Sequence, residues 1–166
     1  MKKTSHPGNL FARESDHLAA LQAAYPHQFR EPAWAYSWPD GWHRLVTEAC
    51  AGLNRLAPDG RWDQIKEKFG GLRLYYHGCP LRLDLHMPDG VICRALDPDG
   101  GPVKPTDLNV LLFGLEGASR ETCALCGGRN GIGRAVNLTG WWITACETCE
   151  PLIRAYRALP DGSDER

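Results

Sequence analysis

The sequence lacks a long apolar run and lacks an excess of either charge. Its longest strongly apolar stretch, residues 110–115, is far too short to span a bilayer. The two lysines near the N-terminus are not followed by the apolar segment that a secretory signal requires, so we expect a cytoplasmic protein. Nineteen lysines and arginines against twenty aspartates and glutamates give a net charge of −1, which disfavours a protein that binds nucleic acid or anionic membrane with its whole surface.

Recognisable catalytic motifs are missing as well. The chain contains no Walker loop, Gly-x-Ser-x-Gly elbow, HExxH sequence or dinucleotide-binding fingerprint. A polar site around Glu67 and His77 is the remaining arrangement from which a metal-dependent hydrolase or nuclease could be built. A solvated hairpin face of alternating charge explains the same residues more simply, so we favour a protein without catalytic activity.

Seven cysteines are present, and four of them form two CxxC pairs: Cys123 with Cys126, and Cys146 with Cys149. In a reducing compartment, cysteines bind metal or pack as free thiols more often than they form disulfides, and an odd count does not fit a fully paired framework. Two residues between cysteines allow both sulfurs of a tight turn to face one ion. The spacing predicts a Zn²⁺ site with four thiolate ligands, with redox-active dithiols as the alternative.

The residues around the two pairs indicate a treble-clef-like zinc finger. Two glycines follow the first pair, two short strands come next at 135–138 and 141–145, and the second pair opens an amphipathic run at 151–159. This order gives a knuckle, a hairpin and a helix whose first turn carries the last two ligands. Four thiolates complete a tetrahedron, so we expect a structural ion without an activated water. No histidine lies after His86, which disfavours a nuclease site of the HNH type in the finger.

The rest of the chain predicts an α+β body. Apolar residues recur at helical spacing in 13–24 and in 40–57, where Asp40 is the expected N-cap, and a further helix begins at about Thr106. Alternating patterns predict strands that form one small antiparallel sheet, with Gly70-Gly71 at a turn: 62–68, 72–77, 81–87 and 91–96. We therefore expect the following organisation: a flexible tail at 1–12, a body of two to three helices and a sheet at 13–118, the zinc finger at 119–160, and a flexible tail at 161–166.

Three cysteines lie outside the CxxC pairs. Cys50 lies next to the apolar face of the 40–57 helix, and we expect a packed thiol there. Cys79 and Cys93 are close in the sequence to His77 and His86, which leaves a second metal site open as an alternative. The spacing of these four residues lacks the short paired ligands of known sites.

Two basic segments could contact a partner. Lys66, Lys68 and Arg73 belong to a stretch with more basic than acidic residues, and a glycine-rich loop carries Arg129 and Arg134 next to the first CxxC pair. Glycine lets such a loop approach a phosphate closely. The simpler explanation is that the two arginines balance the net −2 charge of four thiolates with Zn²⁺.

Trp141 and Trp142 are adjacent on a predicted strand and therefore face opposite sides of it. One can pack on the metal core while the other contacts the body of the protein or, if exposed, marks a partner interface. We favour docking on the body, because a small finger has little core of its own.

Three segments taken together carry a resemblance: residues 40–45, the Lys-Glu-Lys-Phe-Gly-Gly-Leu-Arg sequence at 66–73, and the cysteine segments at 122–127 and 140–146. They resemble a family of small, functionally uncharacterised proteins of bacteria and their phages or prophages. The resemblance covers about two thirds of the chain, and residues 81–105 depart from it and look like an insertion. It implies a zinc finger and a mobile-element context, and it implies no activity.

These observations lead to three hypotheses. The favoured one is a non-enzymatic, zinc-stabilised binding protein, encoded by a phage or prophage, that inhibits or modulates a host protein or nucleoprotein complex. The second is a zinc finger that binds nucleic acid through the basic residues named above. The third is a metal-dependent hydrolase or nuclease. None of the three requires a membrane.

Overall fold

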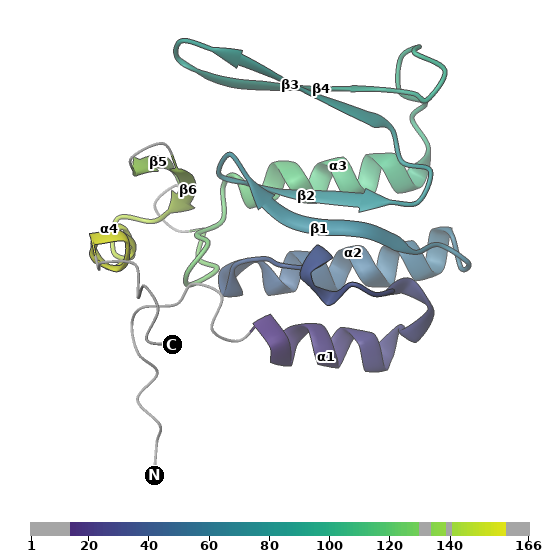
Figure 1. Cartoon of the computed structure of the whole chain (residues 1–166), viewed down its shortest axis with the longest axis horizontal. Helices are drawn as coiled ribbons and strands as arrows, with labels where there is room; N and C mark the ends of the chain where they lie inside the picture. The colour runs from purple at the N-terminus through teal and green to yellow at the C-terminus, as the bar shows by residue number, and fades with distance from the viewer. Residues whose placement is uncertain (1–13, 130–133, 139–140, 159–166) are drawn as a thin grey trace, which may run out of the picture.

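The computed structural model describes residues 14–129, 134–138 and 141–158, and the predicted tails at 1–12 and 161–166 lie outside these ranges. Helices and small antiparallel sheets confirm the α+β prediction (Figure 1). The helices are α1 (Glu14–Ala24), α2 (His43–Leu56), α3 (Asp107–Ser119) and α4 (Glu150–Ala158), with 3-10 turns η1 (Pro26–Gln28), η2 (Ala33–Ala35) and η3 (Asp40–Trp42). The strands are β1 (Trp62–Lys68), β2 (Gly71–Tyr76), β3 (Leu81–Met87), β4 (Gly90–Leu96), β5 (Arg134–Leu138) and β6 (Trp141–Ala145). Within the described ranges, no helix combines the length and the apolar composition needed to cross a membrane.

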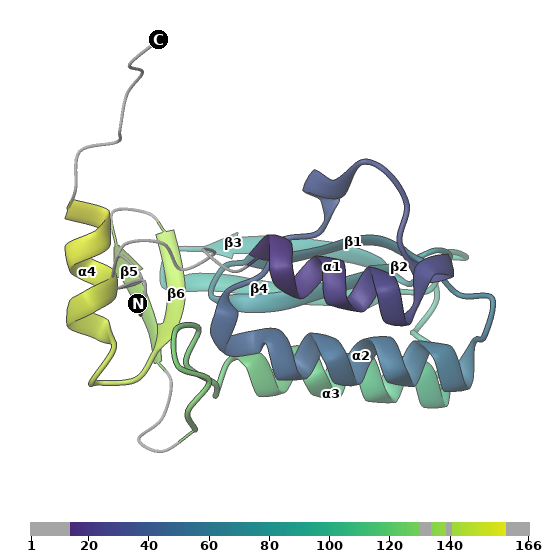
Figure 2. The same cartoon turned by 90° about the horizontal axis from the view of Figure 1, so that it is seen from below.

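The main core lies between α2, α3 and the β1–β2 hairpin. Helix α2 places its apolar residues on one side, as the helical spacing predicts, and Val46 and Leu53 are fully buried there. Helices α2 and α3 contact each other along their length, and α3 also contacts β2 (Figure 2). Three tryptophans in the core are at most 1% exposed: Trp38, Trp42 and Trp62.

A two-residue turn joins β1 to β2. Lys68 pairs with Gly71, so the loop consists of Phe69 and Gly70, whose φ angles are 51° and 76°. Two positive φ angles are the signature of the tight turn that matches the twist of a hairpin. The sequence prediction placed the turn one residue later, because it assigned both positions to glycine. Glu67 stabilises the strained turn by accepting a hydrogen bond from the Gly70 amide at 2.8 Å.

A buried glutamine connects η1 to α2 and β1. The Nε2 atom of Gln28 donates to the carbonyl of Cys50 at 2.9 Å, and the indole nitrogen of Trp62 donates to Gln28 Oε1 at 3.1 Å. Gln28 has no exposed surface. Unpaired polar atoms are costly in a core, so the Gln28 amide satisfies the Cys50 carbonyl and the Trp62 indole, which would otherwise lack these partners.

Asp40 does not cap α2, contrary to the sequence prediction. Pro39 leads into η3, where the Trp42 amide donates to the Pro39 carbonyl at 2.9 Å, and α2 begins only at His43. The carboxylate of Asp40 lies 3.5 Å from the Nε2 atom of His17 instead. Proline presets the φ angle of a turn, so the chain makes one 3-10 turn before the helix.

The β3–β4 hairpin is a sheet of its own, and it does not extend the β1–β2 sheet as predicted from the sequence. Figure 1 shows it lying over α3 and β2, on the side of the molecule away from α1. Its polar side chains face the body, where Arg82 forms an ion pair with Glu116 and Asp84 with Lys68. Its leucines are on the opposite, exposed face. The expected alternation is present, but the buried face is the polar one.

The C-terminal segment packs at one end of the body. In both views β5, β6 and α4 lie beyond the start of α2 and the end of α3 (Figures 1 and 2). Ile143 of β6 and Ile153 of α4 are at most 1% exposed and belong to the same apolar cluster as the body. The finger and the body therefore share a core.

Candidate metal centre

The first CxxC pair lies in a tight knuckle. The amide of Gly127 donates to the carbonyl of Cys123 at 2.9 Å, and the amide of Cys123 donates to the carbonyl of Gly128 at 3.0 Å. Gly127 has a φ of 72°, which a residue with a side chain rarely adopts. The amide of Gly128 points at the sulfur of Cys126 at 3.3 Å. Such an amide favours the thiolate form that binds metal.

The second CxxC pair connects β6 to α4. Cys146 follows the last residue of β6, and its carbonyl accepts hydrogen bonds from the amides of Cys149 and Glu150 at 3.1 and 2.9 Å. Helix α4 begins at Glu150, so both cysteines precede the helix and neither lies within its first turn. The predicted order of knuckle, hairpin and helix is present.

The four cysteines lie close together, with all their sulfur atoms within 4.8 Å of one another. The sulfurs of Cys126 and Cys146 are 3.9 Å apart. A tetrahedral ion with metal–sulfur bonds of about 2.3 Å requires sulfur–sulfur distances of about 3.8 Å. The arrangement therefore has the spacing to hold a metal ion. Cys123, Cys146 and Cys149 are buried, and Cys126 is at the surface.

The thiols of this cluster differ in acidity. Burial raises the pKa of Cys146, but the Cys149 amide and the neighbouring sulfurs outweigh burial and lower this pKa to about 7. Burial raises the pKa values of Cys126 and Cys149. The Cys123 sulfur adds to the rise in both pKa values, whereas the Gly128 amide opposes the rise at Cys126. Four thiols that share one small space cannot all ionise without a cation. A bound cation removes this conflict because it favours deprotonation of its ligands.

The first knuckle is joined directly to the start of α2. The Gly41 amide donates to the Ala124 carbonyl at 2.8 Å, and the indole nitrogen of Trp42 donates to the Thr122 carbonyl at 2.9 Å. A Cβ atom on Gly41 would lie 2.2 Å from the carbonyl oxygen of Cys123, so only glycine fits there. In the sequence Gly41 ends a Pro-Asp-Gly triplet, which indicates a turn and does not indicate this contact. Its contact with a cysteine knuckle is set by tertiary packing.

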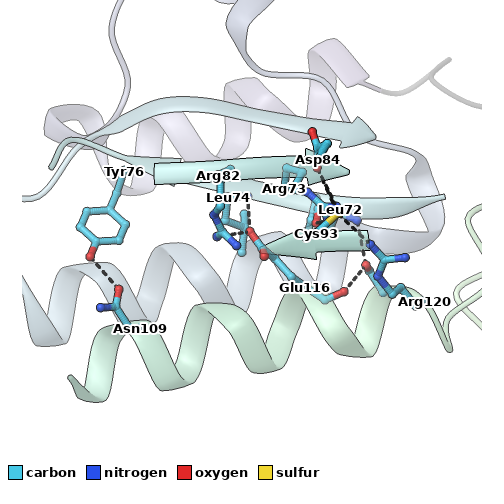
Figure 3. A network of polar contacts seen from close by, with 11 residues as sticks. Leu72, Arg73, Leu74, Tyr76, Arg82, Asp84, Cys93, Asn109, Glu116 and Arg120 are labelled. Carbon is cyan, nitrogen blue, oxygen red and sulfur yellow. Dashed lines mark hydrogen bonds and ion pairs between the residues drawn. The ribbon is translucent and has the colours of Figure 1, made fainter. Parts of the chain in front are cut away.

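The basic residues of the β1–β2 hairpin are engaged within the protein. Lys68 forms an ion pair with Asp84 at 2.5 Å, and Lys66 lies over the ring of Tyr75 at 5.6 Å. Arg73 is 2% exposed and its guanidinium contacts the sulfur of Cys93 (Figure 3). Arg73 is therefore buried, whereas Lys66 and Lys68 are partly exposed and each contacts another side chain of the protein.

The finger residues predicted to contact a partner lie in different surroundings. Arg129 is exposed, and its Nε atom lies 3.5 Å from the hydroxyl of Thr122. Arg134 and Trp141 have their backbones in β5 and β6, and their side chains are outside the described part of the structure. Trp142 lines a hollow of about 140 Å³ together with Phe69. This hollow lies between the finger and the hairpin turns of the body.

Glu67 and His77, the predicted polar site, are not brought together. Glu67 lies beside the β1–β2 turn, whereas His77 follows the far end of β2, where its Nδ1 atom lies 3.4 Å from the carboxylate of Asp63. The hairpin therefore separates them by its whole length.

The remaining cysteines do not assemble a second site in the described ranges. Cys50 is fully buried, and burial raises the pKa of its thiol to about 12 although Trp62 opposes this. It is a packed thiol, as expected. Cys93 contacts Asp84, and His86 packs edge-on against Phe69. The only metal-type cluster among the described residues is the one formed by the four paired cysteines.

Comparison of the chain with protein-family models, curated proteins and solved structures finds no match.

Proposed function

We propose that the four cysteines bind Zn²⁺ and that this ion has a structural role. The observation that carries the proposal is the four-sulfur cluster with its spacing of 3.9 Å between Cys126 and Cys146. Thiolates in a tetrahedral set favour zinc among the available divalent ions. Four protein ligands leave no open coordination position for a substrate or an activated water. The ion would connect the knuckle at Cys123 to the start of α4.

Metal analysis of the purified full chain tests this proposal. We expect about one zinc per chain, which matches four thiolate ligands. Cys146→Ser should lose the zinc. Cys79 is half-buried and lies outside the cluster, so Cys79→Ser is the control and should retain the zinc. Less than about a tenth of an equivalent of zinc in the wild-type chain would contradict a zinc site.

We further propose that the zinc-stabilised chain acts by binding a protein and not by catalysis. Trp34 supports this, because it is 77% exposed on η2 and tryptophans at protein surfaces commonly anchor interfaces. The engaged state of Lys68 and Arg73 also disfavours a broad nucleic-acid face. The resemblance to phage and prophage proteins motivates a host protein or nucleoprotein complex as the target, with inhibition or modulation as the outcome.

Affinity capture from a bacterial extract tests the protein-binding proposal. The wild-type chain should recover a defined partner, and Trp34→Ala should recover less of it. Val110→Ala removes an exposed apolar side chain from α3 and serves as the matched control. Recovery of nothing above background, or equal recovery by Trp34→Ala, would contradict this assignment.

Nucleic acid is the second candidate, and one observation favours it. Arg44 and Arg129 line the same hollow of about 160 Å³ beside the first knuckle. Two arginines at a concave site can contact a phosphate, although Glu48 lines the hollow too. Binding of this kind should weaken steeply with salt and be lost in Arg44→Glu with Arg129→Glu. Unchanged affinity in that double variant would exclude this site.

A further inference from the structure

The outer face of the β3–β4 hairpin is an apolar surface without a partner in the described part of the chain. Its large apolar side chains are between 41% and 55% exposed, and we call them the outer apolar face: Leu81, Leu83, Leu85, Met87 and Ile92. The first four alternate along β3, and Ile92 pairs with Leu85 across the hairpin. Side chains at alternate positions share one face of a strand, so the five form a continuous patch.

The hairpin cannot bury this face by turning over. The opposite face is held to the body by Arg82, which pairs with Glu116 at 2.8 Å and stacks on the Phe113 ring at 4.3 Å. Asp84 on the same side pairs with Lys68. Figure 3 shows Arg82 and Asp84 both directed from β3 toward the body. Reversal of the hairpin would leave these charged groups without partners and is unfavourable.

The exposed area approaches what a specific interface between two copies requires. A fully exposed aliphatic residue presents roughly 200 Å², so five residues at about half exposure contribute roughly 450 Å² from one chain. Two copies would cover about 900 Å² from these residues alone, and specific interfaces begin at about 1,000 Å² in total. The half-buried Leu96 and the aliphatic stem of Arg94, which pairs with Leu83, extend the same surface.

We propose that a second copy of this chain covers the outer apolar face, with two hairpins packed face to face about a two-fold axis. A two-fold interface needs a surface that is complementary to itself. The row on β3 provides one, because an antiparallel copy centred on Asp84 places Leu83 against Leu85 and Leu81 against Met87. Face-to-face packing of two sheets also supplies the second layer that an isolated two-stranded hairpin needs.

Sedimentation equilibrium of the zinc-loaded full chain, from about 1 to 200 μM, tests the proposal. The wild-type chain should dimerise in this range. Leu83→Glu combined with Leu85→Glu should raise the dimer dissociation constant at least about 30-fold. Ile92→Glu places a charge on the same face from β4, where the side chain is also exposed. The proposal can therefore still be tested with Ile92→Glu if the Leu83 and Leu85 variant does not fold. Val110→Glu places the same charge on exposed α3 surface and should dimerise as the wild type does.

Each outcome decides the proposal. A wild-type chain that is monomeric throughout, or a Val110→Glu variant as impaired as Leu83→Glu with Leu85→Glu, overturns it. If the chain is monomeric but the face variants lose a protein captured from extract or bind lipid vesicles less, the face belongs to that other partner and the dimer is refuted. Zinc content is measured for every variant. A chain that binds one zinc but does not dimerise refutes the dimer proposal and leaves the zinc proposal standing.

Discussion

Glu116 on α3 allows the charge and the hydrogen-bonding capacity of one buried group to be separated. Its side chain is buried, and the same oxygen accepts from the Leu74 amide at 2.8 Å and from Arg82 at 2.8 Å (Figure 3). Glutamine in its place keeps an acceptor oxygen at nearly the same position but carries no charge. Alanine removes both the charge and the acceptor.

The structure indicates that the acceptor is worth more than the charge. Burial raises the pKa of Glu116 above its ordinary value of 4.5, although Arg82 and the Leu74 amide oppose this. The short ion pair would suggest the reverse, but a raised pKa means that desolvation of the carboxylate outweighs the attraction. Glu116→Gln leaves Arg82 without a charged partner but keeps an acceptor for the Leu74 amide, so we expect it to cost less stability at pH 7 than Glu116→Ala does. Glu116→Ala should cost about 3 kcal/mol, because the Leu74 amide loses its buried acceptor and side-chain packing is removed.

The pH dependence has a definite sign. The folded state binds the Glu116 proton more tightly than the unfolded state does, so the contribution of this group is greatest below pH 4.5 and declines as pH rises through the folded pKa. Glutamine does not titrate. Stability of Glu116→Gln relative to the wild type should therefore increase between about pH 4 and pH 7.

Urea unfolding of the zinc-loaded chain, followed by tryptophan fluorescence at several pH values, measures these differences. The reasoning is refuted if Glu116→Gln is as destabilising as Glu116→Ala at pH 7. It is also refuted if Glu116→Gln loses stability relative to the wild type as pH rises.

The other predictions concern close packing. Gln28→Ala should cost about 3 kcal/mol in urea unfolding, because it leaves the Trp62 indole and a buried carbonyl of α2 unpaired; a loss below about 1 kcal/mol would contradict the role given to Gln28. Gly41→Ala should destabilise the chain and weaken zinc retention against a chelator, because its Cβ would overlap the Cys123 carbonyl. Gly114→Ala is the control, because no neighbouring group lies within 4 Å of its new Cβ. It should be neutral or stabilise the chain by about 0.5–1 kcal/mol, since alanine favours the helix. Equal zinc retention in the two variants would argue against close contact at Gly41.

Periodicity predicted the elements of the body better than it predicted which faces are buried. The alternation of Leu81, Leu83 and Leu85 is a strand signal, and β3 forms there. Alternation does not say which side meets the body, however. That depends on Glu116 and Lys68, which are distant in the sequence and attract the polar side of the hairpin. A burial rule based on hydrophobicity alone therefore assigns the wrong face.

The cluster of four cysteines could be predicted because each CxxC pair is a local sequence signal. Each CxxC pair fixes a turn by itself, so Cys123, Cys126, Cys146 and Cys149 needed only one long-range contact to come together. Gln28 gave no such signal. Its two partners lie 22 and 34 residues away in the sequence, and nothing near it indicates either contact. Gly41 could not be identified for the same reason.

The hydrogen bond between the Trp42 indole and the Thr122 carbonyl joins positions 80 residues apart. Closing a loop of that length has an entropic cost, which local elements such as the β1–β2 hairpin largely avoid. Contacts of high sequence separation tend to form late in folding. We therefore expect the knuckle at Cys123 to dock beside Gly41 after local elements such as the β1–β2 hairpin have formed.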